Sequence, residues 1–199
     1  SFNLYLILII VTGFFLRFYN LNWDQGGIFH PDEENIARAA NRISFFDQLN
    51  PRFFAYGGIF IYMEKAILDV TPATINQSLG LESIAALNVA GRFLSALFSS
   101  FSVIMIYFLA KEIFDRKIAL ISTYLLAFNV ASIQAAHFAV TESALILLIM
   151  IVVFASLKLL KQPTVFSYVL GGISFGVALA VKSSALTFVI PIAIAHFIT

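Results

Sequence analysis

The sequence is divided into long apolar runs that are separated by short charged segments. A helix needs about 20 apolar residues to cross a bilayer, with a range of about 17 to 25. Runs of about this length predict six membrane spans, at about 1–18, 84–110, 117–136, 141–160, 164–181 and 183–199. The long charged segment between the first two spans, at about 19–83, is predicted to be an external loop. The pattern therefore predicts an all-α membrane protein built as a bundle of transmembrane helices.

The Lys and Arg residues of the short loops predict which ends of the spans face the cytoplasm. Lys111, Arg116 and Lys117 lie in one loop, and Lys158 and Lys161 lie in another, two spans further along the chain. Two loops that are separated by two spans lie on the same side of the membrane. We therefore assign both loops to the cytoplasmic side.

The same count of spans places the loop at 19–83 on the extracytoplasmic side, where it carries eight acidic and four basic residues. Glu142, Arg92 and Lys182 lie at span ends that face the same side. We therefore expect the acidic loop, one further acid and two cations to converge at one membrane face.

The external loop is predicted to contain an amphipathic helix that starts near Pro31. Proline is favoured at the first position of a helix, and Asp32 and Glu33 would lie in the first turn, where the helix dipole favours anions. Apolar and charged residues then fall on opposite sides at helical spacing, which suits a helix along the membrane interface. The apolar positions are Ile36, Ala39, Ile43 and Phe46, and the charged ones are Glu34, Arg38 and Arg42. A second helix is expected at about 59–68.

The composition supports the membrane class and excludes several functions. The chain is 60% apolar and 12% charged, contains 22 Phe, and has a mean hydropathy of +0.93. It has no Cys, and its three His are far apart in sequence, so no metal site is indicated. No Walker loop, dinucleotide fingerprint or basic stripe is present, which argues against a nucleotide or nucleic-acid site. Because the sequence begins and ends inside apolar runs, we expect it to be the N-terminal part of one longer catalytic domain.

Three acids are candidates for catalysis. Asp32 and Glu33 could act as a general base if the surrounding aromatic residues shelter them, since shelter raises the proton affinity of a carboxylate. Glu142 stands at the head of the fourth span, where an acid is costly unless it faces a cavity or finds a partner. The alternative for all three is that they only cap helices.

Two cations at external span ends, Arg92 and Lys182, suit the phosphate of an anionic lipid, and the alternative is that they reach ordinary headgroups. Lys182 follows a helix with Gly171, Gly172 and Gly176, which are expected to permit close packing that draws its end into the bundle. His137 either orients Glu142, binds substrate or simply bonds the backbone. Arg17 is interpreted as a membrane anchor.

Several short motifs carry a resemblance to a known class of enzymes when they are taken in order. They are His30-Pro31-Asp32-Glu33, the stretch Asn50 to Gly57, the stretch Gly91 to Leu97, the stretch Ala110 to Arg116, the stretch His137 to Glu142, and the stretch Gly176 to Lys182. In these motifs the chain resembles the lipid-carrier-dependent glycosyltransferases of the GT-C class. Within that class it is similar to bacterial and archaeal relatives of protein O-mannosyltransferases and of the lipid A aminoarabinose transferase.

The resemblance implies a hexosyl or pentosyl transferase that moves a sugar, with inversion, from a polyprenyl-phosphate carrier to a hydroxyl of a protein, lipid or glycan acceptor. It implies a multi-pass protein of the plasma (inner) membrane with an extracytoplasmic active site, and no nucleic-acid partner. Asp32 maps onto the catalytic base, with Glu33 beside it, and Glu142 stands where Asp is commoner. Arg92 and Lys182 map onto carrier-phosphate contacts. No cofactor is required, and a divalent metal is possible but not indicated.

Four further residues in these motifs are candidates for carrier or substrate binding: His30, His137, Arg52 and Tyr56. Two other functions stay open. A polytopic transporter or lipid flippase would also bury ionisable residues in its spans, near the bilayer midplane and beside broken helices. A non-catalytic membrane assembly subunit would keep the fold without the chemistry.

Overall fold

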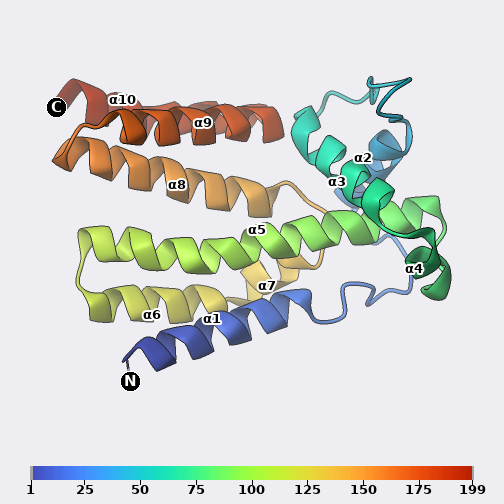
Figure 1. Cartoon of the computed structure of the whole chain (residues 1–199), viewed down its shortest axis with the longest axis horizontal. Coiled ribbons are helices and arrows are strands. Elements are labelled where there is room, and N and C mark those ends of the chain that lie inside the picture. The colour runs from blue at the N-terminus through green and yellow to red at the C-terminus, as the bar shows by residue number, and fades with distance from the viewer. Residues whose placement is uncertain (1, 199) are drawn as a thin grey trace.

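The structure is a computed structural model that describes residues 2–198, and within this range it contains helices and no strands (Figure 1). The α-helices are α1 (Phe2–Phe18), α2 (Pro31–Asn41), α3 (Gly58–Val70), α4 (Ala73–Ser78), α5 (Ser83–Ile113), α6 (Arg116–Ala127), α7 (Val130–Ala136), α8 (Glu142–Lys161), α9 (Val165–Val181) and α10 (Val189–Ile198). A 3-10 helix at Ser183–Phe188 joins α9 to α10.

Helix α5 is the central element of the bundle. It runs nearly the whole length of the molecule, with α1 and α6 on one side and α8, α9 and α10 on the other (Figure 1). Small buried residues on α5, among them Ser95, Ala96 and Ser99, let neighbouring backbones approach closely. The short helices α2, α3 and α4 gather at one end of the bundle, which we call the loop end.

All six predicted spans are helical in the residues described, but their lengths differ. Helices α5 and α8 are long and apolar enough to cross a membrane, and the pair α6 and α7 meets the same test if it is one span bent by 54°. Helices α1 and α9 and the segment Ser183–Ile198 are shorter apolar helices. By length and composition, residues 2–198 therefore contain two or three candidate spans, which agrees with an all-α membrane protein.

The bend between α6 and α7 is stabilised by Arg17, which the sequence had suggested as a membrane anchor. That interpretation is wrong, because the side chain of Arg17 is fully buried. Its guanidinium donates hydrogen bonds to the carbonyl oxygens of Leu126 (2.8 Å) and Ala127 (2.9 Å), the last two residues of α6 before the break. It also donates to the hydroxyl groups of Ser99 and Ser132. Arg17 thus connects α1, α5 and the break.

The predicted amphipathic helix is present as α2, with Pro31 in its first turn. Its apolar face packs against α3 and α5, and Ile36 and Ala39 are fully buried. Phe46 does not continue this face, because α2 ends at Asn41 and a tight turn closed by Ser44 and Gln48 follows. Phe46 is fully exposed in that turn, so the prediction that it extends the apolar face of the helix is wrong. The second expected helix is α3.

The C-terminal end of α9 is held by Gly57, the residue that precedes α3. The backbone N–H of Gly57 donates to the carbonyl oxygen of Val181 (2.9 Å), and a Cβ at Gly57 would lie 1.9 Å from the carbonyl oxygen of Ala180. The glycines of α9 contribute less than expected. Gly171 packs near α8 and α10, whereas Gly172 and Gly176 have no neighbour within 4 Å of the position that a Cβ would take.

Candidate functional site

Arg92, on α5, is the centre of a buried ion-pair cluster at the loop end of the bundle. Its guanidinium donates to Glu33 Oε1 from Nε (2.8 Å) and to Asp24 Oδ1 from Nη1 (2.8 Å). It also donates to the carbonyl oxygen of Leu21 (3.2 Å) and lies over the ring of Trp23, 5.3 Å from the ring centroid. The side chains of Asp24 and Glu33 are fully buried, and that of Arg92 nearly so. The guanidinium is therefore saturated by groups of the protein itself.

Glu33 connects this cluster to the turn that precedes α8. Its Oε1 accepts a hydrogen bond from the backbone N–H of Ala139 (2.9 Å), in addition to the bonds from Arg92. Beside it, Ser95 Oγ accepts from the backbone N–H of Val140 (3.2 Å). The turn at 137–142 is thereby fixed against both α2 and α5.

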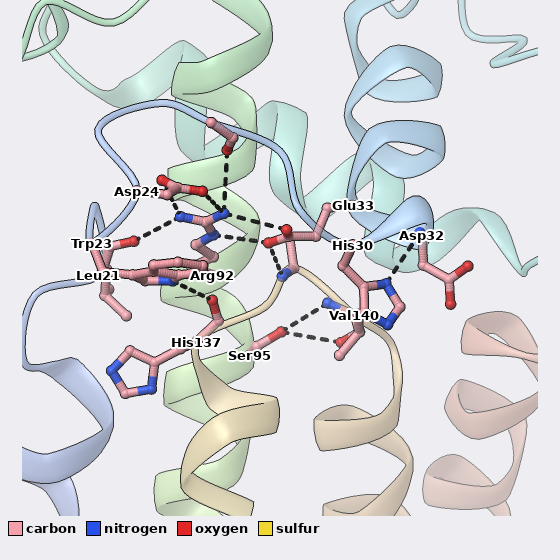
Figure 2. Close-up of polar contacts among 12 residues, drawn as sticks. Leu21, Trp23, Asp24, His30, Asp32, Glu33, Arg92, Ser95, His137 and Val140 are labelled. Carbon is pink, nitrogen blue, oxygen red and sulfur yellow. Dashed lines mark hydrogen bonds and ion pairs between the residues drawn. The ribbon is translucent and has the colours of Figure 1, made fainter.

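Asp32 points the other way. Figure 2 shows its side chain directed away from the cluster around Arg92, while Glu33 faces that cluster. Consecutive residues of an α-helix point in directions about 100° apart. The two neighbouring acids therefore have different surroundings, and only Asp32 faces a cavity.

The cavity lies between the start of α2 and the α7–α8 turn and has a volume of about 360 Å³. Asp32 and Glu142, the two acids on its wall, come from segments more than 100 residues apart. The other residues that line it are His30, Ala131, Gln134, Ala135, Phe138 and Val140. The structure thus brings together the two acids that the sequence predicted to converge.

Lys182 borders the same site. Its Nζ donates to Glu142 Oε1 (2.8 Å) and lies 5.0 Å from the centroid of the Tyr56 ring. The side chain of Lys182 is 25% exposed and that of Glu142 is 45% exposed, so a ligand can reach both. The contact of Gly57 with the end of α9 places Tyr56 beside Lys182.

Tyr56 lies within electrostatic reach of both acids. The pKa of the Tyr56 hydroxyl is raised to about 12 by burial, which is the largest effect, together with a hydrogen bond to Asp32 and the charges of Asp32 and Glu142. The hydroxyl therefore keeps its proton at neutral pH. It can donate that proton in a hydrogen bond to an anionic or carbonyl oxygen.

The two histidines of the predicted site have different environments. His30 is the N-cap of α2, and its Nδ1 accepts a hydrogen bond from the backbone N–H of Asp32 (3.1 Å). In the neutral ring the proton is therefore on Nε2. His137 contacts the carbonyl oxygens of Ile133 (2.8 Å) and Tyr19 (2.9 Å) through its two ring nitrogens. His137 thus bonds the backbone, which was one of the alternatives for it.

Arg52 is not part of this cavity. It is exposed, with a left-handed φ of 51°, and lines a separate cavity with Arg42 and Gln48. Its role in binding carrier or substrate stays a prediction, as do those of the other site residues. The absence of a metal requirement also stays a prediction, and within residues 2–198 no three acidic or histidine side chains form a cluster suited to a metal ion.

Sequence reasoning did not identify several residues that shape the site. Asp24 was overlooked because a single acid in a loop carries no pattern. Gln134 was overlooked because it lies within a predicted span, and Phe138 because it is one apolar residue among many, although its stretch was noted as a motif. Glu64, on α3, was overlooked because the helix expected at about 59–68 is mostly apolar and was assigned no function. Its carboxyl group is fully buried, and neither oxygen has a hydrogen-bond partner.

Comparison with known proteins adds one finding. A model of the family described as dolichyl-phosphate-mannose-protein mannosyltransferase matches residues 7–199. No curated protein matches the sequence.

Proposed function

The chain belongs to the dolichyl-phosphate-mannose-protein mannosyltransferase family, and from this membership we propose an activity for the site at the loop end of the bundle. Membership supports a membrane mannosyltransferase that uses a polyprenyl-phosphate-linked sugar donor and a protein acceptor. We propose further that the sugar passes to an acceptor hydroxyl at the cavity of Asp32 and Glu142, with inversion, on the extracytoplasmic face.

One observation carries this proposal: two carboxylates line a single cavity, and a reachable cation borders it. Asp32 and Glu142 face the cavity, and Lys182 lies 2.8 Å from Glu142. A base for the acceptor and positive charge for the leaving phosphate are the two requirements of the reaction. Both are supplied at one end of the bundle by segments that are distant in sequence.

In the proposed reaction the acceptor hydroxyl oxygen attacks the anomeric carbon of the donor sugar from the side opposite the phosphate. The new carbon–oxygen bond forms as the bond to the phosphate oxygen breaks, which inverts the anomeric carbon. The hydroxyl proton passes to the carboxylate of Asp32, and the polyprenyl phosphate leaves with the bonding electron pair as an anion.

Lys182 is the cation best placed to stabilise the departing phosphate. The lysine is an ammonium group on a flexible stem and is partly exposed, so it can turn from Glu142 toward an incoming phosphate. The Tyr56 hydroxyl, which keeps its proton, can donate to the same phosphate. Arg92 is buried and saturated by Asp24 and Glu33, so we assign it to holding the site together.

The role of Glu142 follows from its position. It shares the cavity with Asp32 and holds Lys182 while no phosphate is bound. When the lysine turns to the phosphate, the Glu142 carboxylate is free to accept a hydrogen bond from the acceptor or the sugar. We therefore propose that Glu142 orients substrate and that Asp32 is the base.

The test is an Asp32→Asn variant of the full-length protein, assayed in lipid with dolichyl-phosphate mannose and an acceptor peptide. A positioned general base contributes about 10²- to 10⁴-fold to a rate, so a loss of at least 100-fold in kcat is expected. Glu34→Gln is the matched control, because Glu34 lies on the same helix and pairs with Arg38 at the surface. Turnover by Asp32→Asn equal to that of the control would refute the assignment of the base.

The side of the membrane requires a separate test. Single cysteines at Glu34, on the same helix as Asp32, and at Lys117, in the predicted cytoplasmic loop, would be treated with a membrane-impermeant thiol reagent on intact cells. Labelling at position 34 and protection at position 117 are expected. The opposite pattern would contradict an extracytoplasmic site.

A further inference from the structure

The wall of the cavity includes the aromatic ring of Phe138, which packs against two other rings. Phe138 packs edge-on against Trp23, with ring centroids 6.0 Å apart, and its ring is tilted against the His30 ring at 5.4 Å. The backbone beside it is also fixed, because the carbonyl oxygen of His137 accepts a hydrogen bond from Trp23 Nε1 (3.3 Å). Phe138 is therefore a fixed apolar surface in the wall of a cavity that Asp32 and Glu142 also line.

Hydrogen-bonding groups surround this ring. His30 has its Nδ1 engaged by the Asp32 backbone, which leaves the Nε2–H of the neutral ring as its donor. Gln134 lines the cavity with an exposed side chain whose amide offers both a donor and an acceptor. Ala131 and Ala135, on either side of Gln134, are small and leave space for a ligand.

This combination matches the chemistry of a pyranose ring. Such a ring has an apolar face of C–H groups, which packs against an aromatic side chain, and hydroxyl groups that need hydrogen-bond partners. The cavity volume of about 360 Å³ lies within the usual range of small-molecule sites, about 300–1,000 Å³. The wall around Phe138 is therefore suited in size and polarity to one sugar.

We infer that Phe138 and Gln134 form the subsite for the hexose of the donor, with the sugar face on the Phe138 ring and its hydroxyls bonded to Gln134 and His30. The inference rests on the proposed function, because that function places the donor phosphate at Lys182. The anomeric carbon is one bond from a phosphate oxygen, so a phosphate at Lys182 directs the ring past Glu142 into the cavity. Gln134 is then a specificity-determining residue for the hydroxyl pattern of the sugar.

The test measures binding and does not require turnover. Full-length protein in nanodiscs would be titrated with dolichyl-phosphate mannose and with dolichyl phosphate. The Kd for dolichyl phosphate divided by the Kd for dolichyl-phosphate mannose gives the contribution of the sugar to binding. The wild type is expected to bind the sugar-bearing lipid more tightly. Phe138→Leu and Gln134→Ala are each expected to reduce this ratio by about 3- to 10-fold, as for the loss of one good contact.

Val130→Leu is the matched control, because Val130 starts the same helix, is 77% exposed and does not line the cavity. Its ratio is expected to equal that of the wild type. If Phe138→Leu does not fold, Gln134→Ala decides, because the Gln134 side chain is exposed and supports no core contact.

Two outcomes overturn the inference: a ratio of one in the wild type, or a ratio that neither cavity substitution changes. Failure of this inference can be distinguished from failure of the proposed function. A protein with sugar-dependent binding that needs Phe138 but with no transfer contradicts the function alone. A protein that transfers mannose with an unchanged ratio in both variants contradicts the subsite alone.

Discussion

Replacement of Arg92 by methionine tests whether this cation holds the fold or binds the carrier. Methionine keeps much of the length of the side chain but removes the charge and all the hydrogen bonds to Asp24, Glu33 and Leu21. The two carboxylates would then be buried without compensation. Breaking a buried pair by removing one partner costs about 3–5 kcal/mol, so we expect a loss of this size in the free energy of unfolding.

Lys182→Met is the matched comparison, because its ion pair with Glu142 is partly exposed. An exposed pair contributes about 0–1 kcal/mol, so this variant is expected to keep its stability. Its KM for dolichyl-phosphate mannose is expected to rise by at least about 10-fold, because it lacks the proposed contact with the donor phosphate and a hydrogen bond to a charged group contributes about 1.5–3 kcal/mol. Arg92→Met should therefore lower the stability of the protein, whereas Lys182→Met should weaken the binding of the carrier.

The assay is chemical or thermal unfolding of the full-length protein in detergent, together with donor titration of the folded fraction. A triple variant, Arg92→Met with Asp24→Asn and Glu33→Gln, removes the uncompensated charges and should recover part of the lost stability. If Arg92→Met is as stable as the wild type and raises the donor KM, Arg92 binds the carrier and our structural assignment is refuted.

Two further predictions concern residues around the site. Burial and the charge of Glu33 raise the pKa of the Glu64 carboxyl well above its usual range, so the folded protein binds this proton more tightly than the unfolded chain does. The free energy of unfolding is therefore highest below the unfolded-state pKa of about 4.5. It falls by about 1.4 kcal/mol per pH unit as the pH rises toward the folded-state pKa. The free energy of unfolding of Glu64→Gln should therefore depend less on pH than that of the wild type, and the variant should be the more stable protein at pH 8. Parallel profiles of the two unfolding free energies from pH 5 to 8 would contradict this. Gly57→Ala should lose about 1–3 kcal/mol of stability together with transfer activity, because a Cβ there overlaps the Ala180 carbonyl oxygen. Gly172→Ala is the control, because the added carbon meets open space. It should match the wild type in both unfolding and transfer assays.

The parts of the fold that follow local rules could be predicted from the sequence. Proline and acids at 31–33 indicated the start of α2, and the charge-free runs indicated the apolar helices, because these signals depend on neighbouring residues only. The convergence of Asp32, Glu142 and Lys182 followed from counting spans. This count is a global constraint that needs no side-chain detail.

The direction of individual side chains could not be predicted. Asp32 and Glu33 have the same chemistry and adjacent positions, and only packing decides that Glu33 meets Arg92 while Asp32 faces the cavity. Arg17 looked like an anchor because the break that it binds is formed by residues more than 100 positions away. Phe46 matched helical spacing, but the helix ended before it.

The bonds of Glu33 bear on how substrates move in and out during turnover. Because the same carboxylate binds Arg92 on α5 and the backbone of Ala139, the rim of the cavity formed by α2 and the α7–α8 turn is costly to separate. The opposite rim rests on the partly exposed contact between Lys182 and Glu142, which water and salt weaken. Widening the mouth on the α9 side therefore requires less free energy, and the carrier and acceptor of the proposed reaction would pass there while Asp32 stays in place.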